Sequence, residues 1–310
     1  MDISPKYIDL HTHTIYSDGL LSPQALLEKA HKYGLSAISI TDHNTIDGYI
    51  PGLFEYAKSL DIELVSGIEF SCVDEEKRKY HILGYFLDLE NQDLKNITAQ
   101  IKIDNNANIQ AIVDLMKKDH WFIGEKRLFD EKGTLTKAHI AREIIENQKN
   151  NFKLKSLFNG HIPTEGELIE ATMIANMPYF VFNDKRILPT DAIKIIKAAN
   201  GIAIAAHPAF NIMRGDNAPD LCQRLKNWGV DGFEAISIQF DKSNNDSEFE
   251  CIDLFTKYAL ANNLVITGGS DFHHADTKMM GNLIDLGFKN HNLKVPFKIL
   301  EDLKKYKATN

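Results

Sequence analysis

Residues 7–41 read YIDLHTHTIYSDGLLSPQALLEKAHKYGLSAISIT and contain one complete strand–helix–strand pattern. The two strand candidates are the short apolar runs Tyr7–Leu10 and Ala37–Thr41. Between them, Ser22 can cap a helix, Pro23 suits its first turn and Gly34 can end it. The apolar stripe of this helix consists of Leu26, Leu27 and Ala30. The pattern predicts two parallel strands joined by a helix.

The same alternation continues along much of the chain, and helical patterns lie between most of the apolar runs. Further strand candidates are Glu63–Phe70, Tyr80–Phe86, Ile202–Ala206, Phe233–Ile238 and Leu264–Thr267. Alternation of this kind predicts parallel strands. Seven such strands are too many for a small sandwich, and they suit either a (β/α) barrel or an open doubly wound sheet.

The alternation is interrupted between about Asp93 and Leu188. This stretch is polar and helical, is rich in Asn and Lys from Glu146 to Lys155, and is followed by an amphipathic helix from Thr190 to Ala199. We interpret it as an inserted helical subdomain. The predicted organisation is a first part of the barrel at 1–92, the helical insertion at 93–188 and a second part of the barrel at 189–310.

Composition restricts the class of protein. The 310 residues include 35 Lys and Arg against 43 Asp and Glu, which gives a formal charge of −8. This charge disfavours a protein that coats nucleic acid without sequence specificity. Hydrophobic residues make up 44% and charged residues 25%, as in ordinary folded proteins. The lysine pairs Lys117–Lys118 and Lys304–Lys305 suit solvated helix ends better than a long nucleic-acid track.

Targeting signals and cysteine usage point to a soluble cytoplasmic protein. The N-terminal residues have no basic stretch followed by an apolar core, as a signal peptide requires. No apolar run approaches the roughly 20 residues that span a bilayer, so we expect no membrane contact. Cys72, Cys222 and Cys251 are widely spaced and odd in number, which fits reduced thiols.

Two histidines follow the first strand in the motif His11-Thr12-His13. Residues i and i+2 of an extended chain point the same way, so both imidazoles can face one cation. Alone the motif is weak evidence, because a chain of this length with 12 histidines is expected to contain about 0.5 His-x-His motifs by chance. It becomes informative because similar side chains recur after other strands.

The other histidines and carboxylates of interest also follow predicted strands. They are Asp18 after the first strand, His43 after the second, Glu69 at the end of the third, His207 after Ile202–Ala206, and Asp271 and His273 after Leu264–Thr267. Functional groups of barrel enzymes gather at the carboxyl ends of the strands, so we expect these side chains to meet at one rim. His81 lies near the start of its apolar run and is not placed by this argument.

The chemistry of this set points to divalent cations. Six histidines and three carboxylates without cysteine suit Zn, Mn or Fe, and they exceed what one ion can use. Two or three ions bridged by Glu69 would make a hydrolytic centre. Each residue alone has a simpler explanation: Asp18 can shape a turn with Gly19, Asp42 can cap a helix, and His81 can be a core histidine.

Short segments around these residues resemble the PHP (polymerase and histidinol phosphatase) superfamily. The matching segments are Asp9-Leu10-His11-Thr12-His13, Ser17-Asp18-Gly19, Thr41-Asp42-His43, Gly67-Ile68-Glu69, His81 with Leu83-Gly84, Ala206-His207-Pro208 and Gly269-Ser270-Asp271-Phe272-His273. The chain looks most similar to phosphoesterases that remove the 3′-phosphate from nucleoside 3′,5′-bisphosphates, some of which also degrade short RNA from the 5′ end. The resemblance implies an α/β fold, a distorted (β/α)7 TIM-like barrel with a helical insertion.

The resemblance also implies a set of ligands for two or three divalent ions, manganese first, with zinc, iron or magnesium as alternatives. It groups His11, His13, Glu69 and Asp271 on one ion, Glu69, His81 and His207 on a second, and Asp18, His43 and His273 on a third. Glu69, Asp271 and His207 are the predicted catalytic residues. The expected reaction is hydrolysis of a phosphate monoester by metal-activated hydroxide, with the leaving oxygen stabilised by a metal or protonated by a nearby acid.

Other groups are expected to support the metals or the substrate. Asp9, Asp42 and Glu234 are candidates to accept hydrogen bonds from the ligating histidines. A second phosphate on the substrate would need side-chain donors, and the candidates are Arg142 and His139, from the motif Lys137-Ala138-His139-Ile140-Ala141-Arg142 that resembles the family's insertion, together with Arg214. Tyr179 and Phe180 could stack on a base but suit a core equally well.

Three other functions stay open at this stage. The substrate could be histidinol phosphate, the centre could hydrolyse an amide, or the chain could be a non-catalytic metal-binding PHP module that acts with a partner protein. The expected partner is a small phosphorylated substrate, a nucleotide or short oligonucleotide. The oligomeric state is not predicted.

Overall fold

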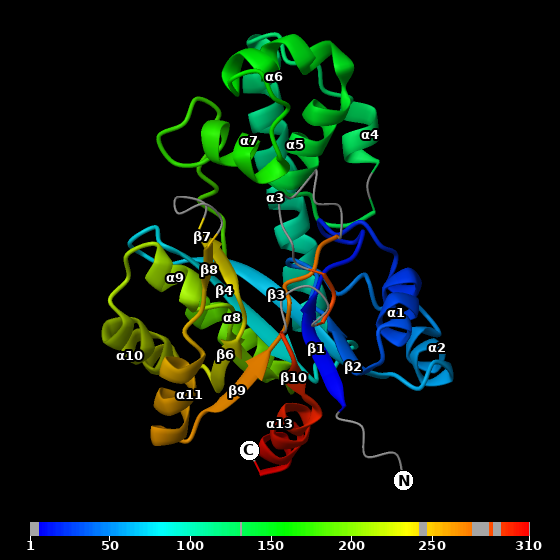
Figure 1. Cartoon of the computed structure of the whole chain (residues 1–310), viewed down its shortest axis with the longest axis vertical. Coiled ribbons are helices and arrows are strands. Elements are labelled where there is room, and N and C mark those ends of the chain that lie inside the picture. Colours follow the sequence, from blue (N-terminus) through cyan, green and yellow to red (C-terminus); the bar gives the residue numbers. More distant parts are fainter. Residues whose placement is uncertain (1–5, 131, 242–246, 275–284, 288–292, 310) are drawn as a thin grey trace.

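A single curved sheet forms the centre of the molecule (Figure 1). The computed structural model describes residues 6–130, 132–241, 247–274, 285–287 and 293–309. All seven predicted strands are present, as β1 (Tyr7–Thr12), β2 (Leu35–Ile40), β3 (Glu63–Val73), β4 (Lys79–Tyr85), β5 (Ile202–Ala205), β6 (Gly232–Ile236) and β9 (Val265–Gly268). They lie in the order β10-β1-β2-β3-β4-β5-β6-β9, with β10 at Val295–Pro296.

The sheet closes almost completely into a barrel. After β9 the chain returns beside β1, where the Phe272 amide donates to the His11 carbonyl at 3.3 Å and the His13 amide donates to the Phe272 carbonyl at 2.8 Å. The predicted distorted TIM-like barrel is therefore confirmed. Three short strands were not predicted: β10 and the separate hairpin of β7 (Gln239–Asp241) and β8 (Ser247–Phe249). Runs of two or three residues carry no readable period.

One strand departs from the predicted direction. The pairs β1–β2, β2–β3, β5–β6 and β6–β9 are parallel, but β4 is antiparallel to both β3 and β5. The connection from β3 to β4 is a tight turn, in which Asp74 accepts hydrogen bonds from the amides of Glu76 and Arg78. The prediction of uniformly parallel strands is therefore wrong at β4. Because β4 is reversed, its first residues lie at the rim where the parallel strands end.

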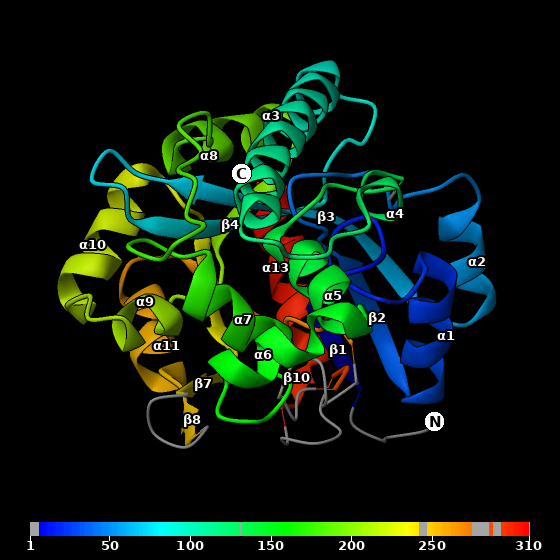
Figure 2. The ribbon, with the colours of Figure 1, turned by 90° about the horizontal axis from the view of Figure 1, so that it is seen from above.

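Helices cover the outside of the barrel (Figure 2). They are α1 (Pro23–Lys32), α2 (Leu53–Ser59), α8 (Pro189–Ala198), α9 (Ala209–Met213), α10 (Ala218–Trp228), α11 (Ile252–Ala261) and α13 (Phe297–Thr309). The first helix follows the sequence prediction: the Ser22 hydroxyl accepts from the Ala25 amide at 3.2 Å, and Gly34 adopts φ +73° after its end. A positive φ there favours glycine.

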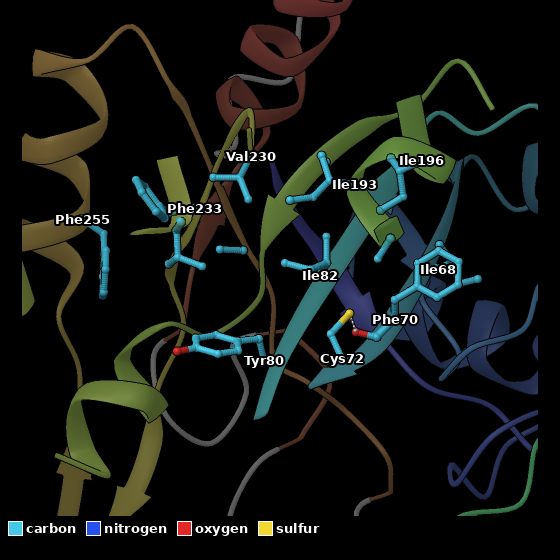
Figure 3. Packing of buried hydrophobic residues seen from close by; sticks show 14 of the residues in the cluster. Ile68, Phe70, Cys72, Tyr80, Ile82, Ile193, Ile196, Val230, Phe233 and Phe255 are labelled. Atoms are coloured by element: carbon cyan, nitrogen blue, oxygen red, sulfur yellow. Dashed lines mark hydrogen bonds between the residues drawn. The ribbon is translucent and has the colours of Figure 1, made fainter. Parts of the chain in front are cut away.

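The main core lies between the sheet and the outer helices (Figure 3). Ile68 and Ile82 of adjacent strands pack with Ile193 and Ile196 of α8, and all four side chains are buried. A Cβ on Gly84 would lie 2.9 Å from Ile196 Cγ1, so glycine allows α8 to approach β4 closely. A second cluster fills the barrel and includes Leu300 and Leu303 of α13, which covers the end of the barrel opposite the insertion (Figures 1 and 2).

The described residues between β4 and α8 form helices and connecting segments, with no strand among them. The helices are α3 (Gln92–Lys118), α4 (Glu125–Phe129), α5 (Lys137–Glu146), the 3₁₀ helix η1 (Gln148–Asn150), α6 (Asn151–Leu157) and α7 (Glu165–Thr172). They enclose a separate hydrophobic cluster that includes Ile112, Met116, Ile140 and Leu168. Figure 1 shows this layer above the barrel rim. We therefore propose 93–188 as the insertion and 1–92 and 189–310 as the two parts of the barrel.

Two other expectations concern the described helices and the cysteines. None of the helices in the described ranges is both long and apolar enough to cross a membrane. Cys72, Cys222 and Cys251 are all free thiols, and the first two are buried.

Candidate metal centre

The barrel rim below the insertion gathers the nine histidines and carboxylates singled out in the sequence. Parallel strands bring His11 at the end of β1, His13 directly after it, His43 after β2 and Glu69 from β3 to this rim. His43 also forms an isolated parallel bridge with Glu69. His81 reaches the same place because β4 is antiparallel: it is paired with Ser71, two residues beyond Glu69. The reversed strand thus explains why His81 lies at the start of its apolar run.

Glu69 lies at the centre of the cluster and is fully buried. Its Oε2 is 2.9 Å from His43 Nδ1, 3.3 Å from His13 Nε2 and 3.4 Å from His11 Nε2. Its Oε1 is 2.8 Å from His81 Nδ1 and 3.2 Å from His207 Nε2. One carboxylate therefore contacts five imidazoles from four segments of the chain.

Two further carboxylates extend the cluster on either side of His13. Asp271 Oδ1 is 3.1 Å from His13 Nε2 and 3.2 Å from His11 Nε2. Asp18 Oδ1 is 3.3 Å from His273 Nε2 and 3.9 Å from His13 Nδ1, and Asp18 Oδ2 is 3.8 Å from His43 Nε2.

The backbone is unusual at two of these positions. His207 has φ +27° and Asp271 has φ +55°, a region that residues other than glycine seldom adopt. Strained backbone of this kind gathers at functional sites, where the surrounding structure fixes it.

Three groups of these side chains have potential ligand atoms within 4.8 Å of one another. They are His11, His13, Glu69 and Asp271; His13, Asp18, His43 and His273; and His43, Glu69 and His81. The first group is the one that the family resemblance implies. The second group contains the implied set of Asp18, His43 and His273, with His13 in addition. The third differs from the implied set of Glu69, His81 and His207, because it contains His43 in place of His207. Shared members make the three groups one continuous cluster.

Among the described residues, several buried atoms of the cluster lie near other polar atoms but form no hydrogen bond of acceptable geometry, namely His11 Nε2, Asp18 Oδ1, Glu69 Oε2 and His207 Nδ1. Buried polar atoms without a partner are costly, and native proteins rarely contain several together. Divalent cations would satisfy them. Nitrogen and oxygen donors without sulfur suit Mn, Zn or Fe, so the residues present fit the metals that the family resemblance implies.

The electrostatics of the cluster leave lone pairs available for cations. Burial alone would raise the pKa of Glu69, but His43, His81 and His11 hold it well below its usual range. Burial lowers the pKa of His13 to about 3, with repulsion from His273 and His43, and it lowers the pKa of His81 to about 4. At neutral pH, Glu69 is ionised and both of these imidazoles are neutral.

Glu234 of β6 supports the cluster from below and is almost fully buried. Its carboxylate lies 2.9 and 3.1 Å from His11 Nδ1 and accepts the His207 amide at 2.8 Å. Nδ1–H donation to this carboxylate leaves His11 Nε2 facing Glu69 and Asp271. The prediction that Glu234 supports a ligating histidine agrees with this contact.

Asp9 and Asp42 behave differently from the prediction. Asp42 accepts from the Thr14 amide at 2.7 Å, the Thr14 hydroxyl at 2.6 Å and the Ser17 hydroxyl at 2.7 Å. Asp9 accepts from the amide and hydroxyl of Ser270 and from the Gly287 amide. Neither accepts a hydrogen bond from an imidazole of the described residues, and these contacts hold the loops of the rim.

Arg142 and His139 of α5 reach the rim from the insertion. Arg142 Nε donates to Glu165 at 2.9 Å, and its Nη2 donates to the Asp18 carbonyl at 3.1 Å. His139 is buried, and its Nδ1 accepts the Thr136 amide at 3.0 Å in a capping box. Burial lowers the pKa of His139 to about 4, with Asp18 acting in the opposite direction. Both side chains are thus committed to contacts within the protein.

The remaining predicted substrate contacts lie apart from those two residues. Arg214 follows α9, is exposed, and its guanidinium lies 3.9 Å from the centre of the Phe210 ring. Tyr179 is buried, with its hydroxyl between Trp121 Nε1 at 2.9 Å and Asp119 at 2.8 Å. Tyr179 is therefore part of the insertion core, the alternative left open for it.

A cavity of about 230 Å³ lies between the barrel rim and the insertion. Its walls include Asp18, His43 and His81 of the metal cluster, Asn105 and Asn108 of α3, and the cationic residues Lys79, Lys137, Lys185 and Arg186. Sequence reasoning missed this cationic wall. Lys79 could have been found, because it is two residues before His81 and alternate residues of a strand share a face; Arg186 lies in an irregular segment without such a signal.

Comparison with known proteins gives the family context. The family described as PHP domain matches residues 9–214. A 5′–3′ exoribonuclease of Haemophilus influenzae is 31% identical over 271 residues, which cover 86% of this chain and 90% of that protein. A 3′,5′-nucleoside bisphosphate phosphatase of Chromobacterium violaceum is 24% identical over 270 residues, covering 86% and 87% of the two chains.

Solved structures agree at the level of the fold. A Bifidobacterium adolescentis structure described as that of a metal-dependent phosphoesterase has a TM-score of 0.75 at 23% identity, covering 97% of this chain and 96% of that one. The family match extends over more than half of the chain and contains seven of the nine residues of the cluster. On this evidence, the chain belongs to the PHP domain family.

Proposed function

We propose that this protein hydrolyses the 3′-phosphate of nucleoside 3′,5′-bisphosphates and also degrades short RNA from the 5′ end. Its general class follows from family membership and from the buried His, Asp and Glu cluster: it is a metal-dependent hydrolase of phosphate esters. The finer proposal draws on the activities named for the relatives from H. influenzae and C. violaceum. The observation that carries it is the carboxylate of Glu69, which five imidazoles surround beside a cavity.

The proposed ligands share one rim and are His11, His13, Asp18, His43, Glu69, His81, His207, Asp271 and His273. We propose two or three divalent ions, with manganese the first candidate. Bound there, such ions supply positive charge for phosphoryl oxygens and lower the pKa of a coordinated water. The side chain of Asp271 is 30% exposed whereas that of Glu69 is fully buried, so Asp271 can orient water and accept its proton. Glu69 and His207 are more deeply buried and hold the other proposed ligands in place.

The size of the cavity favours a small substrate. A volume of about 230 Å³ between rim and insertion accommodates part of a nucleotide. With a net charge of −8, the protein needs local positive charge to bind a phosphate ester. Metals and the cationic wall together supply it, which favours a nucleotide or the end of a short RNA over a long nucleic-acid track. We also propose a cytoplasmic location, in keeping with the three free cysteines.

Purification followed by metal analysis and a phosphate-release assay tests the proposal. We expect bound or activating divalent metal, and release of phosphate from adenosine 3′,5′-bisphosphate in the presence of Mn²⁺. Histidinol phosphate and a short RNA are assayed beside it. Turnover of histidinol phosphate alone would replace the proposed substrate, whereas a protein that neither binds nor responds to divalent metals would contradict the assigned centre. Copurification of a partner without any turnover would favour the non-catalytic alternative.

A further inference from the structure

Among the described residues, two arginines lack the ion pairs that the other arginines have: Arg186, which lies in the cavity wall, and Arg214, which does not. The chain contains six arginines, and four pair with carboxylates, as Arg78–Asp74, Arg127–Glu143, Arg142–Glu165 and Arg224–Asp216. In the described part of the chain, Arg186 and Arg214 contact no carboxylate within ion-pair distance. Charged groups removed from water are normally paired. An unpaired guanidinium in a cavity wall therefore points to an anion from outside the protein.

Two lysines reinforce the charge around Arg186. Lys79 has no acceptor for its amine among the described residues, and the amine of Lys137 donates only to the Met173 carbonyl. Arg186 and Lys79 are brought together at the end of β3, where Val73 is paired with Lys79 and donates its amide to the carbonyl of Ile187 at 3.1 Å. Burial lowers the pKa of Lys137 to about 7, with repulsion from Lys79 and Arg186.

No carboxylate of the described cavity wall neutralises these three cations. The wall includes two carboxylates, Asp18 and Asp104. Asp18 belongs to the metal cluster, and Asp104 pairs with Lys185 at 3.0 Å. The first turn of α5, from Thr136 to Ala138, also lines the cavity and adds the positive end of a helix dipole. The cations thus line the same cavity as Asp18, His43 and His81 of the metal cluster.

We propose that Lys79, Lys137 and Arg186 form a subsite for a phosphate group of the substrate that is not cleaved. This inference rests on the proposed function, because it assigns the reacting phosphate to the metal centre and the second phosphate to the cationic wall. The second phosphate is that of a nucleoside 3′,5′-bisphosphate or the neighbouring phosphate of an RNA. Arginine and lysine suit a phosphate because they donate several charge-assisted hydrogen bonds.

The subsite replaces Arg142 as the principal contact for the second phosphate. The guanidinium of Arg142 is already occupied by Glu165 and by the Asp18 carbonyl. Its contacts join α5 to the loop that carries Asp18, so Arg142 is a positioning residue. Arg214 is near enough to Lys79 to add to the repulsion on its amine, but it is not among the residues of the cavity wall.

Kinetics with paired substrates test the subsite. The variants are Arg186→Gln and Lys79→Gln, and the matched control is Lys194→Gln on the outer face of α8, where Lys194 is exposed and pairs with Asp191. With Mn²⁺ present, both test variants should raise KM for adenosine 3′,5′-bisphosphate by about tenfold to a hundredfold. KM for adenosine 3′-monophosphate should change by less than about twofold, because that substrate lacks the second phosphate. An equal loss on both substrates, or none on the bisphosphate, would overturn the proposal.

A short RNA identifies the source of the phosphate. A higher KM of Arg186→Gln for RNA supports use of the subsite by the neighbouring phosphate of the polymer. An unchanged KM for RNA, beside a raised KM for the bisphosphate, supports a subsite confined to mononucleotides. Arg186→Lys keeps the charge and should recover part of the affinity, which a general folding defect would not explain.

Binding of adenosine 5′-monophosphate separates the subsite from the proposed reaction, because it requires no turnover. Calorimetric titration of the Mn²⁺-loaded full chain should show affinity for this nucleotide that Arg186→Gln weakens and Glu69→Gln retains. Affinity lost in Glu69→Gln but kept in Arg186→Gln would place the phosphate at the metal centre and overturn the subsite. If binding depends on Arg186 but the bisphosphate is not hydrolysed, the proposed function fails while the subsite stands.

Discussion

Glu69 shows how one buried carboxylate organises a polar barrel rim. Its two oxygens lie between 2.8 and 3.4 Å from five imidazoles, and the side chain is fully buried. A buried carboxylate is unfavourable unless several groups compensate its charge. Here the compensating groups themselves come from separate segments, so losing this carboxylate should affect all of them together.

We expect Glu69→Gln to reduce metal content and turnover in parallel. The amide keeps the size of the side chain but removes the negative charge and one acceptor, so kcat/KM should fall on the order of a hundredfold or more. Metal analysis and kinetics on the same preparations check this. Glu63→Gln, at the start of the same strand, is the control: Glu63 is half-buried and pairs with Lys304 at 2.6 Å, away from the cluster, so metal content and turnover should stay as in the parent. A fully metallated but inactive Glu69→Gln would show that the residue acts only in the reaction.

Glu234 should act through His11 rather than through a metal. Glu234→Gln weakens the acceptor that faces His11 Nδ1, so metal affinity should fall about tenfold to a hundredfold. Competition with a metal-binding dye measures the change. Excess Mn²⁺ should restore most of the turnover, because the proposed ligands themselves are retained. A loss that excess metal cannot restore would argue against this indirect role.

His139 should make the folded protein less stable as the pH falls. Its pKa is about 4 in the folded protein against an ordinary value of 6.5, because burial disfavours the charged imidazole. The unfolded chain therefore binds more protons between these values, and stability is lost as pH falls from about 6.5 to about 4. Between these pH values the free energy of unfolding should fall in both proteins, but the fall should be about 3 kcal/mol smaller in His139→Gln than in the parent.

Urea unfolding in the presence of a chelator measures this difference. Glutamine can keep the capping box, since it also accepts the amide at the start of the helix. His161→Gln, which alters an exposed histidine, is the control and should follow the parent curve. Parallel curves for His139→Gln and the parent would contradict a buried neutral imidazole.

Among the secondary-structure elements, α5 and α7 attach the insertion to the metal centre. Arg142 of α5 pairs with Glu165 of α7 and donates to the Asp18 carbonyl on the β1–α1 loop. The Thr134 amide donates to the Tyr16 carbonyl of the same loop at 2.8 Å. These contacts fix the loop that carries Asp18 from above.

A double-mutant cycle tests the pair between these two helices. Arg142→Ala leaves the buried Glu165 carboxylate without its partner and should destabilise the protein by about 3 kcal/mol. Combined with Glu165→Gln, it should cost less than the sum of the single changes, with a coupling of about 1 to 3 kcal/mol. Denaturant unfolding of the three variants supplies the values. Additive losses would show that the two side chains do not interact in solution.

At the scale of the whole molecule, the metal centre joins segments that are distant in the chain, from β1 to the loop after β9. At its centre, buried atoms such as His11 Nε2 and Glu69 Oε2 form no hydrogen bond of acceptable geometry with the described residues. The folded state should therefore bind divalent cations far better than the unfolded chain does, and binding of this kind stabilises the native state.

Removal of metal should lower the melting temperature. At a free Mn²⁺ concentration about a hundred times Kd, binding contributes about 2.7 kcal/mol, which corresponds to several degrees for a chain of this length. Differential scanning calorimetry with Mn²⁺ and with a chelator measures the shift. Glu69→Gln should reduce the shift, and an equal shift in that variant would place the stabilising ions elsewhere.

Much of the barrel was predictable because its strands are buried on both faces and give continuous apolar runs. The convergence of His11, His43, Glu69 and His207 followed from the same rule, since parallel strands end at one rim. The direction of β4 was overlooked although a signal existed. Its connection to β3 is far shorter than the dozen or more residues that a parallel crossover needs.

The cationic wall was less accessible to prediction. Arg186 is in an irregular segment, and only the packing of that segment against β3 brings it to the cavity. The roles of Asp9 and Asp42 were also hidden, because an aspartate beside a histidine in sequence can bind either an imidazole or a loop amide. Such choices depend on loop geometry, which has no periodic signature in the sequence.

The reversed direction of β4 also determines how the insertion is connected to the barrel. β4 ends at the side of the barrel away from the insertion, so α3 runs back along the outside of the barrel toward the insertion. Its 27 residues span about 40 Å. Leu94 and Ile101 pack in the main core between the sheet and the outer helices, whereas Ile112 and Met116 of the same helix pack in the insertion core. Because one continuous helix joins the two cores, we expect the insertion to move little relative to the barrel, and a substrate would then reach the cavity from the side, between the two layers.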